Sequence, residues 1–228
     1  MSKAKILIID DEPSIVKLVE AYLKPEGYEV LTASDGNAGL KAARAFKPDL
    51  LILDVMLPGM DGIELLSRLR RESEVYVIML TARTDEMDKI VGLTVGADDY
   101  VTKPFSPREL TARVKAALRR IQTGAASRSD TTVLAFRHIR IDAGARQVAV
   151  DDQPVELTAL EFDLLRILAE NRGRVLTREQ LLENVWGGEY FGETRVVDVH
   201  LGHVRQKIGD QFIVTVRGVG YRFEDELL

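Results

Sequence analysis

The chain has 228 residues, enough for one large domain or two ordinary ones. Its apolar fraction of 46% and charged fraction of 29% are typical of a globular protein in water. It contains no cysteine, which excludes disulfide bonds and thiolate metal sites and fits a cytoplasmic protein. The net charge is −5, and residues 122–228 carry 13 Lys and Arg against 17 Asp and Glu, so overall charge argues mildly against nucleic-acid binding.

Short apolar runs recur along residues 1–121 and alternate with stretches of helical periodicity. None is long enough for a signal-peptide core or a membrane span, so we expect no membrane partner. Near-continuous apolar runs indicate strands that are buried on both faces, as in a parallel sheet. Five strands, each followed by a helix, predict an α/β, doubly wound (βα)5 domain with the flavodoxin-like strand order 2-1-3-4-5. The runs are Ile6–Ile9, Val30–Leu31, Leu50–Leu53, Val77–Leu80 and Tyr100–Val101.

The periodic pattern stops near Ile121. Residues 122–131 are small and polar, so we expect a linker that separates a first domain, 1–121, from a second, 132–228. In the second domain, apolar and polar residues alternate on either side of Ala143–Gly144, which predicts a small antiparallel hairpin.

Three short helices and a closing hairpin are expected in the rest of the second domain. Capping boxes at Thr158–Glu161 and Thr177–Gln180 begin two of the helices. The third helix is expected from about Thr194 to Ile208, and Phe212–Phe223 has the alternation and glycines of a hairpin. This layout predicts a winged helix-turn-helix.

Polar side chains stand at the carboxyl ends of four predicted strands in the first domain. Asp10 and Asp11 follow the first strand, Asp54 ends the third, Thr81 the fourth and Lys103 the fifth. Ligands of doubly wound sheets bind at this edge, so the five side chains are expected to converge there. Clustered carboxylates need a cation, and oxygen ligands of this kind favour Mg²⁺. A carboxylate can also attack phosphorus, although each residue taken alone would be an ordinary helix cap or surface side chain.

The first domain resembles response-regulator receiver domains over residues 4–121. The matching motifs are Ile8–Glu12, Leu53–Gly62, Leu80–Ala82 and Gly96–Phe105.

This resemblance implies a role for each residue of the acidic edge. It makes Asp54 the phosphoacceptor. Asp11, Asp54 and the backbone carbonyl of Met56 would bind Mg²⁺ directly, with Asp10 helping through water. Thr81 and Lys103 would bind the phosphoryl group.

Two further features of the first domain follow from the resemblance. It implies a cis peptide at Lys103–Pro104. It also implies that Tyr100 is the aromatic switch residue, for which an ordinary half-buried strand tyrosine is the alternative.

The third helix of the second domain has one apolar stripe, made by Val197, Leu201, Val204 and Ile208. The other face carries small, basic and amide side chains, which suits a helix lying in the major groove of double-stranded DNA. An ordinary charged surface helix is the alternative. The residues expected to contact DNA, on this helix and in the closing hairpin, are Arg195, Val199, His203, Arg205, Lys207, Thr215 and Arg217.

The second domain is similar to the effector domain of OmpR/PhoB-family response regulators. The motifs are Leu157–Leu165, Val175–Leu182, Val185–Gly187, Arg195–Leu201 and Val216–Phe223. The resemblance implies that Gly187–Glu193 meets RNA polymerase. One departure is Gly202–His203, where the family often has two arginines, and it leaves open which bases are read.

The sequence leaves three functions to compare for the whole chain. The favoured one is a transcription factor that a sensor histidine kinase phosphorylates, with no enzymatic activity beyond self-phosphorylation and slow autodephosphorylation. A dehalogenase-like phosphatase would need a second acid two residues after Asp54, where the chain has Met56. A regulator that no longer uses phosphate is disfavoured by the intact acidic edge.

Phosphorylation is expected to produce a homodimer. The resemblance implies intermolecular ion pairs at its interface, and pairing of the same charges within one chain is the alternative. The residues are Lys89, Asp99, Glu109 and Arg113.

Overall fold

The computed structural model of the chain contains two compact units, which divide between Leu118 and Arg119 and are described separately. No helix among the described residues is both long and apolar enough to cross a membrane. The structure describes residues 3–82, 95–126, 133–187 and 194–226.

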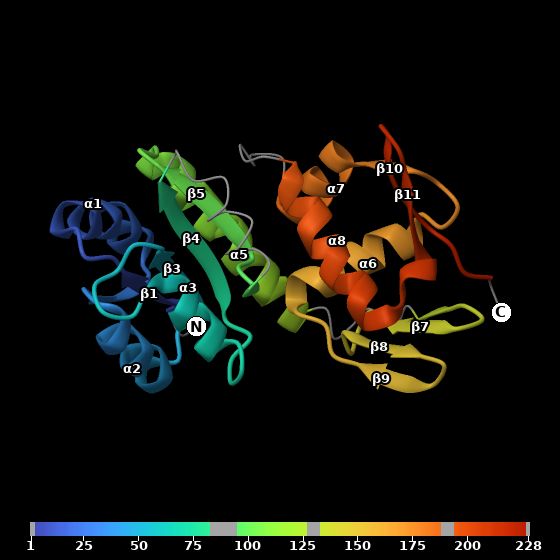
Figure 1. Ribbon diagram of the computed structural model, residues 1–228, viewed down its shortest axis with the longest axis horizontal. Coiled ribbons are helices and arrows are strands. Elements are labelled where there is room, and N and C mark those ends of the chain that lie inside the picture. Colours follow the sequence, from blue (N-terminus) through green and yellow to red (C-terminus); the bar gives the residue numbers. More distant parts are fainter. Residues whose placement is uncertain (1–2, 83–94, 127–132, 188–193, 227–228) are drawn as a thin grey trace. The chain divides into compact units, whose positions relative to one another are not determined.

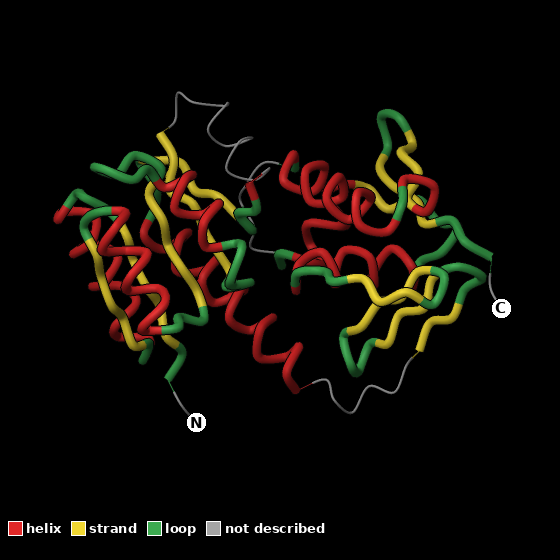
Figure 2. The backbone as a smooth tube through the Cα atoms, turned by 60° about the horizontal axis from the view of Figure 1, so that its bottom comes forward, coloured by secondary structure: helices red, strands yellow, loops and turns green. Residues whose placement is uncertain are grey.

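The N-terminal unit is built on a five-stranded parallel sheet with the order β2-β1-β3-β4-β5 (Figure 1). This is the predicted order, and helices cover both faces of the sheet (Figure 2). The strands are β1 (Lys5–Ile9), β2 (Glu29–Ala33), β3 (Leu50–Asp54), β4 (Tyr76–Ala82) and β5 (Asp99–Lys103). The helices are α1 (Pro13–Leu23), α2 (Gly36–Phe46), α3 (Gly62–Leu69) and α5 (Pro107–Ala126), with a 3-10 turn η1 (Lys24–Glu26) after α1.

Burial of the strands follows their place in the sheet. The apolar residues of β1 and β3 and most of β4 are buried, as near-continuous apolar runs predict. The expectation of burial on both faces is wrong for β2, in which no residue is buried and Leu31 is 38% exposed. β2 is an edge strand, and its sequence carries Glu29 and Thr32 in place of an unbroken apolar run.

The chain turns sharply after β3, so that α3 begins close to the end of that strand. Asp61 caps α3 by accepting a hydrogen bond from the Glu64 amide at 2.7 Å, and Gly62 N–H donates to the Val55 carbonyl at 2.9 Å. A Cβ on Gly62 would lie 2.0 Å from the Asp54 carbonyl oxygen. Glycine is therefore required here, because it lets α3 begin directly against the end of β3.

Two consecutive buried aspartates fix the amino end of β5. Asp98 accepts hydrogen bonds from the Arg70 guanidinium and from the Val77 amide, both at 2.8 Å. Asp99 pairs instead with Arg113 of α5, at 2.9 Å. The strand is therefore held at this end by charged contacts to α3's end and to α5.

In the described part of the C-terminal unit, the helices α6, α7 and α8 accompany a four-stranded antiparallel sheet and a three-stranded sheet. The predicted hairpin around Ala143–Gly144 is present, with Ile139 opposite Val150. The strands β6, β9 and β10 were not predicted, because two or three residues are too few to show alternation. The elements are β6 (Val133–Ala135), β7 (Ile139–Asp142), β8 (Gln147–Val150), β9 (Gln153–Val155), α6 (Ala159–Glu170), β10 (Leu176–Thr177), α7 (Arg178–Val185), α8 (Arg195–Ile208), η3 (Asp210–Phe212), β11 (Ile213–Val216) and β12 (Gly220–Phe223).

The capping boxes predicted for this unit are both formed. Thr158 and Glu161 exchange hydrogen bonds at the start of α6, and Thr177 and Gln180 do so at the start of α7. α8 begins and ends where the sequence predicts. The β11–β12 hairpin follows it, so the unit has a winged-helix layout.

The helix α5 continues through Ala126, beyond the predicted start of the linker at residue 122. The loss of apolar periodicity at Gln122 predicts the end of the helix there. Gln and Ala are good helix formers, so an established helix can continue without an apolar stripe.

We expect Gly220→Ala to lower the free energy of unfolding of the C-terminal unit by about 1–3 kcal/mol. A Cβ at Gly220 would lie 2.0 Å from the Leu176 carbonyl oxygen, so β12 would be forced away from β10. Gly202→Ala is the control: nothing lies within 4 Å of its Cβ position on α8, and a gain of up to about 1 kcal/mol is expected. Urea unfolding followed by fluorescence of Trp186, the single tryptophan, measures both. Equal effects of the two substitutions would contradict the packing argument.

Candidate functional site

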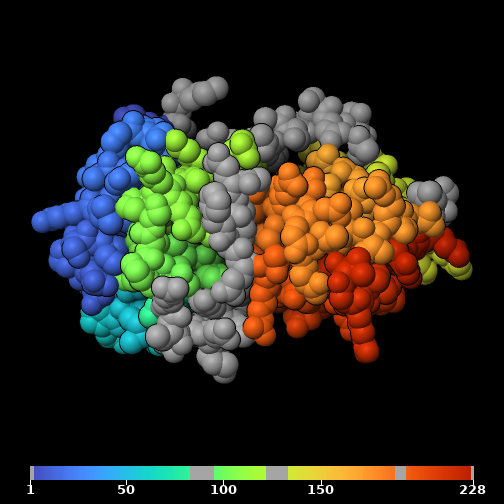
Figure 3. Space-filling model, turned by 90° about the horizontal axis from the view of Figure 1, so that it is seen from above, coloured from blue at the N-terminus to red at the C-terminus, as the bar shows by residue number. Residues whose placement is uncertain are grey.

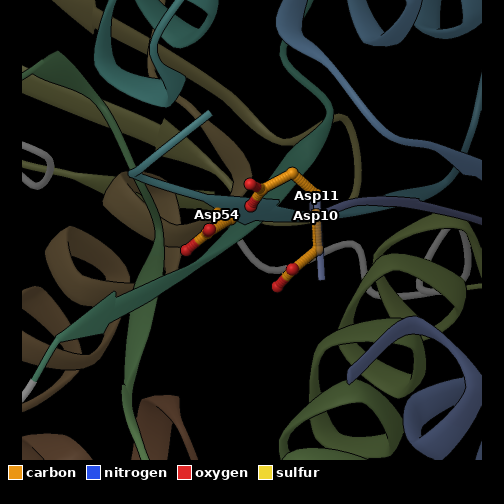
Figure 4. Close-up of side chains that lie close together, drawn as sticks. All are labelled: Asp10, Asp11 and Asp54. Atoms are coloured by element: carbon orange, nitrogen blue, oxygen red, sulfur yellow. The ribbon is translucent and has the colours of Figure 1, made fainter. Parts of the chain in front are cut away.

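Three carboxylates meet at the carboxyl edge of the parallel sheet. Asp10 and Asp11 follow β1, and Asp54 ends the neighbouring strand β3 (Figure 4). Each offers one oxygen atom to a set whose members all lie within 4.8 Å of one another. Asp10 and Asp54 are buried, at 1% and 4% exposed, whereas Asp11 is exposed to solvent.

Lys103, at the end of β5, brings an ammonium group to the same edge. Its Nζ lies 2.9 Å from Asp10 Oδ2 and 3.2 Å from Asp54 Oδ1. A third carboxylate, Glu12, lies 3.1 Å from the same Nζ. This contact was not predicted, although Glu12 directly follows the Asp10–Asp11 pair in the sequence.

Thr81 has a buried hydroxyl at this edge. The residue is 1% exposed, and its Oγ1 has no hydrogen-bond partner among the described residues. A buried unpaired hydroxyl costs free energy, so the group is suited to meet an oxygen atom of a ligand. Tyr100, the predicted switch residue, is 5% exposed in β5, so it is more deeply buried than an ordinary half-buried strand tyrosine. The Lys103–Pro104 peptide is cis, as predicted.

Burial raises the pKa of Asp54 to about 6, and the negative charges of Asp10 and Asp11 act in the same direction. The Lys103 ammonium opposes this rise, but it does not cancel it. Carboxylates that accumulate charge in this way are stabilised by a divalent cation.

The donor set fits Mg²⁺. It consists of hard carboxylate oxygens at the edge of a sheet, with Asp11 open to solvent and able to share the ion with water. Met56, two residues beyond Asp54, is 69% exposed, and its side chain contributes no second acid. The acid that a dehalogenase-like phosphatase requires is absent at that position.

The predicted dimer residues lie close together within one chain. Arg113 pairs with Asp99 at 2.9 Å and with Glu109 at 2.8 Å, and it is 6% exposed. Within the single chain, Asp99, Glu109 and Arg113 therefore form the intramolecular pairs that were the alternative, and intermolecular pairing stays a prediction. Lys89 lies outside the described residues.

The apolar stripe of α8 is buried as predicted. Val197, Leu201 and Val204 are fully buried, and Ile208 is 4% exposed. Arg195 on the other face is exposed, and Val199, Gly202 and His203 are partly exposed. In the space-filling view, the orange-to-red surface belongs to residues of the C-terminal unit (Figure 3), in which α7 and α8 contact each other.

Two basic residues of α8 bind groups of neighbouring elements within the unit, although Lys207 remains exposed and Arg205 partly exposed. Arg205 Nε donates to the Ile213 carbonyl of β11 at 2.8 Å. Lys207 Nζ donates at 2.7 Å to Glu161, the carboxylate of the α6 capping box. The position of a basic residue on this helix therefore does not by itself direct its side chain toward DNA, because a long side chain can bind a neighbouring element instead. Arg217, in the turn of the β11–β12 hairpin, is exposed.

A polar contact that joins α8 to α7 and β12 was also not predicted. Asp198 accepts hydrogen bonds from Tyr221 Oη and from Arg178 Nε, both at 2.7 Å. A tyrosine and an acid far apart in the sequence gave no signal for this pair. In the predicted polymerase loop, Gly187–Glu193, residues 188–193 lie outside the described residues.

Two protein-family models match separate parts of the chain. Residues 6–115 match the family described as "Response regulator receiver domain", and residues 152–223 match "Transcriptional regulatory protein, C terminal". The alkaline phosphatase synthesis transcriptional regulatory protein PhoP of Bacillus subtilis is 47% identical, with 97% of both chains covered. The chain belongs to the OmpR/PhoB family of response regulators.

Further relatives of this OmpR/PhoB-family chain agree. The sensory transduction protein RegX3 of Mycolicibacterium smegmatis is 45% identical over 96% of this chain and 98% of its own. A solved structure of a RitR mutant has a TM-score of 0.75 at 31% identity, covering 97% of this chain and 99% of its own. The response regulator DrrB of Thermotoga maritima, described as an OmpR/PhoB homolog, has a TM-score of 0.53 at 36% identity, with 97% and 99% covered.

Family membership establishes the general function. The OmpR/PhoB-family chain is a two-component response regulator that acts as a phosphorylation-dependent transcription regulator, and its family consists of regulators and not of classical enzymes. Dimerisation is typical of the family, and its receiver domains bind Mg²⁺ at an acidic pocket.

We expect the Mg²⁺ affinity of the receiver to fall about tenfold for each pH unit below about 6. The reason is that Asp54 is protonated there and the ion must displace the proton. In Asp54→Asn, binding should be weaker and nearly independent of pH from about 5 to about 7, roughly one unit on either side of the Asp54 pKa. Isothermal titration calorimetry measures both proteins. A wild-type affinity that is constant across this range would contradict the assignment of Asp54 as a ligand.

Proposed function

We propose that Asp54 accepts a phosphoryl group from a sensor histidine kinase in a reaction that requires Mg²⁺. The observation that carries the proposal is the meeting of Asp54 with Lys103 Nζ at 3.2 Å, beside two further aspartates and the unpaired Thr81 hydroxyl. The ion would be held by Asp11, Asp54 and the Met56 carbonyl, with Asp10 acting through water.

Each group has a distinct part in the transfer. A carboxylate oxygen of Asp54 forms a bond to phosphorus while the phosphorus–nitrogen bond of the donor histidine breaks, and the imidazole keeps the electron pair. When bound, Mg²⁺ neutralises charge on the phosphoryl oxygens. Lys103 already lies against Asp54, so its ammonium is placed to pair with a phosphoryl oxygen. Self-phosphorylation and slow autodephosphorylation are the extent of the chemistry.

The phosphoryl group would then change the balance between two states of the receiver. Its added negative charge attracts Lys103 and gives the Thr81 hydroxyl a partner. Tyr100, next to the anchored end of β5, would follow this movement as the switch residue. A ligand shifts such an equilibrium by as much as its affinities for the two states differ.

Phosphorylation would favour a homodimer through the face that carries Lys89, Asp99, Glu109 and Arg113. Because Arg113 is already paired and buried within its own chain, exchange of partners is required before it can bridge two subunits. Exposed ion pairs are individually weak, so apolar contact on the same face must contribute.

The C-terminal unit, residues 132–228 in the proposed division, would bind double-stranded DNA with α8 in the major groove and the hairpin against the backbone or minor groove. Arg195 and Arg217 are exposed and form no ion pair with the described residues, which supports contacts to phosphate. Val199 and His203 lie on the partly exposed face that would meet base edges. Gly187–Glu193 would meet RNA polymerase, and we place the protein in the cytoplasm.

We expect acetyl phosphate with Mg²⁺ to add one phosphoryl group to the wild-type chain and to increase dimer formation. Asp54→Ala should gain neither mass nor dimer, because the attacking carboxylate is absent. Intact mass spectrometry and sedimentation velocity on the same samples measure the two effects. Asp61→Ala, at an exposed cap outside the cluster, is the matched control and should be phosphorylated normally. An Asp54→Ala chain that is phosphorylated at the wild-type rate would refute the site.

We expect His203→Arg to change the operator sequence that the protein selects. Arginine offers a fixed fork that bonds guanine O6 and N7 together, worth about 1–3 kcal/mol of discrimination, whereas histidine offers fewer donors. In-vitro selection with the phosphorylated proteins measures the preference, and a gain of guanine at one position is predicted. Gln153→Arg adds the same group at an exposed position of β9, outside α8 and the hairpin, and is the control that should select the wild-type sequence. If His203→Arg also selects the wild-type sequence, His203 does not face the bases.

A further inference from the structure

Arg205 lies on the helix that would enter DNA, yet its guanidinium group binds the β11–β12 hairpin. Its Nε donates to the Ile213 carbonyl at 2.8 Å, and its Nη2 donates to Thr215 Oγ1 at 2.7 Å. Its guanidinium carbon also lies 5.3 Å from the centre of the Tyr221 ring in β12. Three partners of this side chain therefore come from the two strands of the hairpin.

A second polar connection joins the same two elements. Tyr221 Oη donates to Asp198 in the first turn of α8 at 2.7 Å, and Arg178 at the start of α7 donates to the same carboxylate oxygen. Burial and the bond to Asp198 raise the pKa of Tyr221 to about 12, so its hydroxyl stays protonated and remains a donor. Asp198 and Arg205 are about two helical turns apart, so α8 is tied to the hairpin at two separated points.

The base of the hairpin is anchored by packing and pairing: Ile213 and Phe223 are buried, β12 packs against α6, and β12 pairs with Leu176 and Thr177 of β10. The two strands have four residues each, and the turn between them, with Arg217, is exposed. The side-chain bonds of Arg205 and Tyr221 are thus important for fixing where the hairpin tip, with Arg217, lies relative to α8.

We propose that Arg205 is a positioning residue and not a phosphate contact: it fixes the spacing between α8 and the hairpin so that both reach DNA in one complex. The inference rests on the proposed DNA-binding function and assigns a different role to this arginine from the one that its place on the helix suggests. A guanidinium group that turned to phosphate would leave the Ile213 carbonyl without its side-chain donor.

Arg195 provides a matched comparison, because Arg195→Met and Arg205→Met each remove one positive charge from α8. Operator affinity of the phosphorylated protein is measured as a function of salt concentration. Removing a phosphate contact lowers the slope of log affinity against log salt by about 0.9, and we expect this for Arg195→Met. Arg205→Met should keep the wild-type slope and lose about tenfold in affinity, as expected for a lost charge-assisted hydrogen bond. A slope lowered by about 0.9 in Arg205→Met would overturn the proposal.

A double-mutant cycle with Arg217→Ala tests whether Arg205 acts through the hairpin. If it does, Arg205→Met costs little once the contact of the hairpin tip is gone, so the two losses in affinity are far from multiplicative. Independent contacts would give losses that multiply to within about twofold, and that result would overturn the proposal.

Trp186 fluorescence reports whether Arg205→Met folds. If it does not fold, Arg205→Lys, which keeps the positive charge, is used in its place. Lysine lacks the fork that joins the Ile213 carbonyl to the Thr215 hydroxyl, so affinity should still fall about tenfold, as for the lost charge-assisted hydrogen bond, with the slope unchanged. Wild-type affinity in this variant would overturn the proposal. If the phosphorylated wild-type protein shows no salt-dependent operator binding, the proposed DNA-binding function fails, and no variant is needed to see it.

Discussion

Negative charge at the carboxyl edge of the parallel sheet exceeds the positive charge that faces it. The Lys103 ammonium is within 3.2 Å of three carboxylates, and a fourth, Asp11, belongs to the same cluster. Because Asp10 and Asp54 are buried, water does not screen this imbalance well. Burial, with the negative charges of Asp10 and Asp11 in support, raises the pKa of Asp54 to about 6. A bound divalent cation neutralises part of this excess negative charge, whereas a phosphoryl group adds negative charge. Both ligands therefore change the electrostatics of the site.

The rest of the N-terminal unit keeps these charges in place. Parallel pairing of β1 with β3, and of β4 with β5, delivers the acids, the hydroxyl and the ammonium to one edge. Gly62 then allows α3 to begin against the Asp54 carbonyl, so the backbone of Asp54 is enclosed while its side chain remains at the edge. The C-terminal unit uses buried charge differently: its pairs, such as Lys207 with Glu161, join elements to one another.

Sequence reasoning located the acidic edge well because strand ends and parallel order determine it. Asp10, Asp54, Thr81 and Lys103 needed nothing beyond their strands to converge. The helical positions of Arg205 and Lys207 were predicted correctly, but the directions of their side chains were not, because these reach β11 and α6. Periodicity gives the face of a helix on which a residue stands, but it does not give the direction of a long side chain. The pair of Tyr221 with Asp198 was missed for a related reason, since only tertiary packing brings it together.

The two aspartates at the start of β5 have a mechanical consequence. Asp98 is bound to Arg70 and Asp99 to Arg113, on different helices, whereas the opposite end of the strand is tied through Lys103 to the groups that phosphorylation would alter. If one end of a strand is held and the other end is displaced, the strand changes its direction more than its position. Tyr100 lies next to the held end of β5, where the backbone moves least. A change in the orientation of its ring is therefore the main movement available to it.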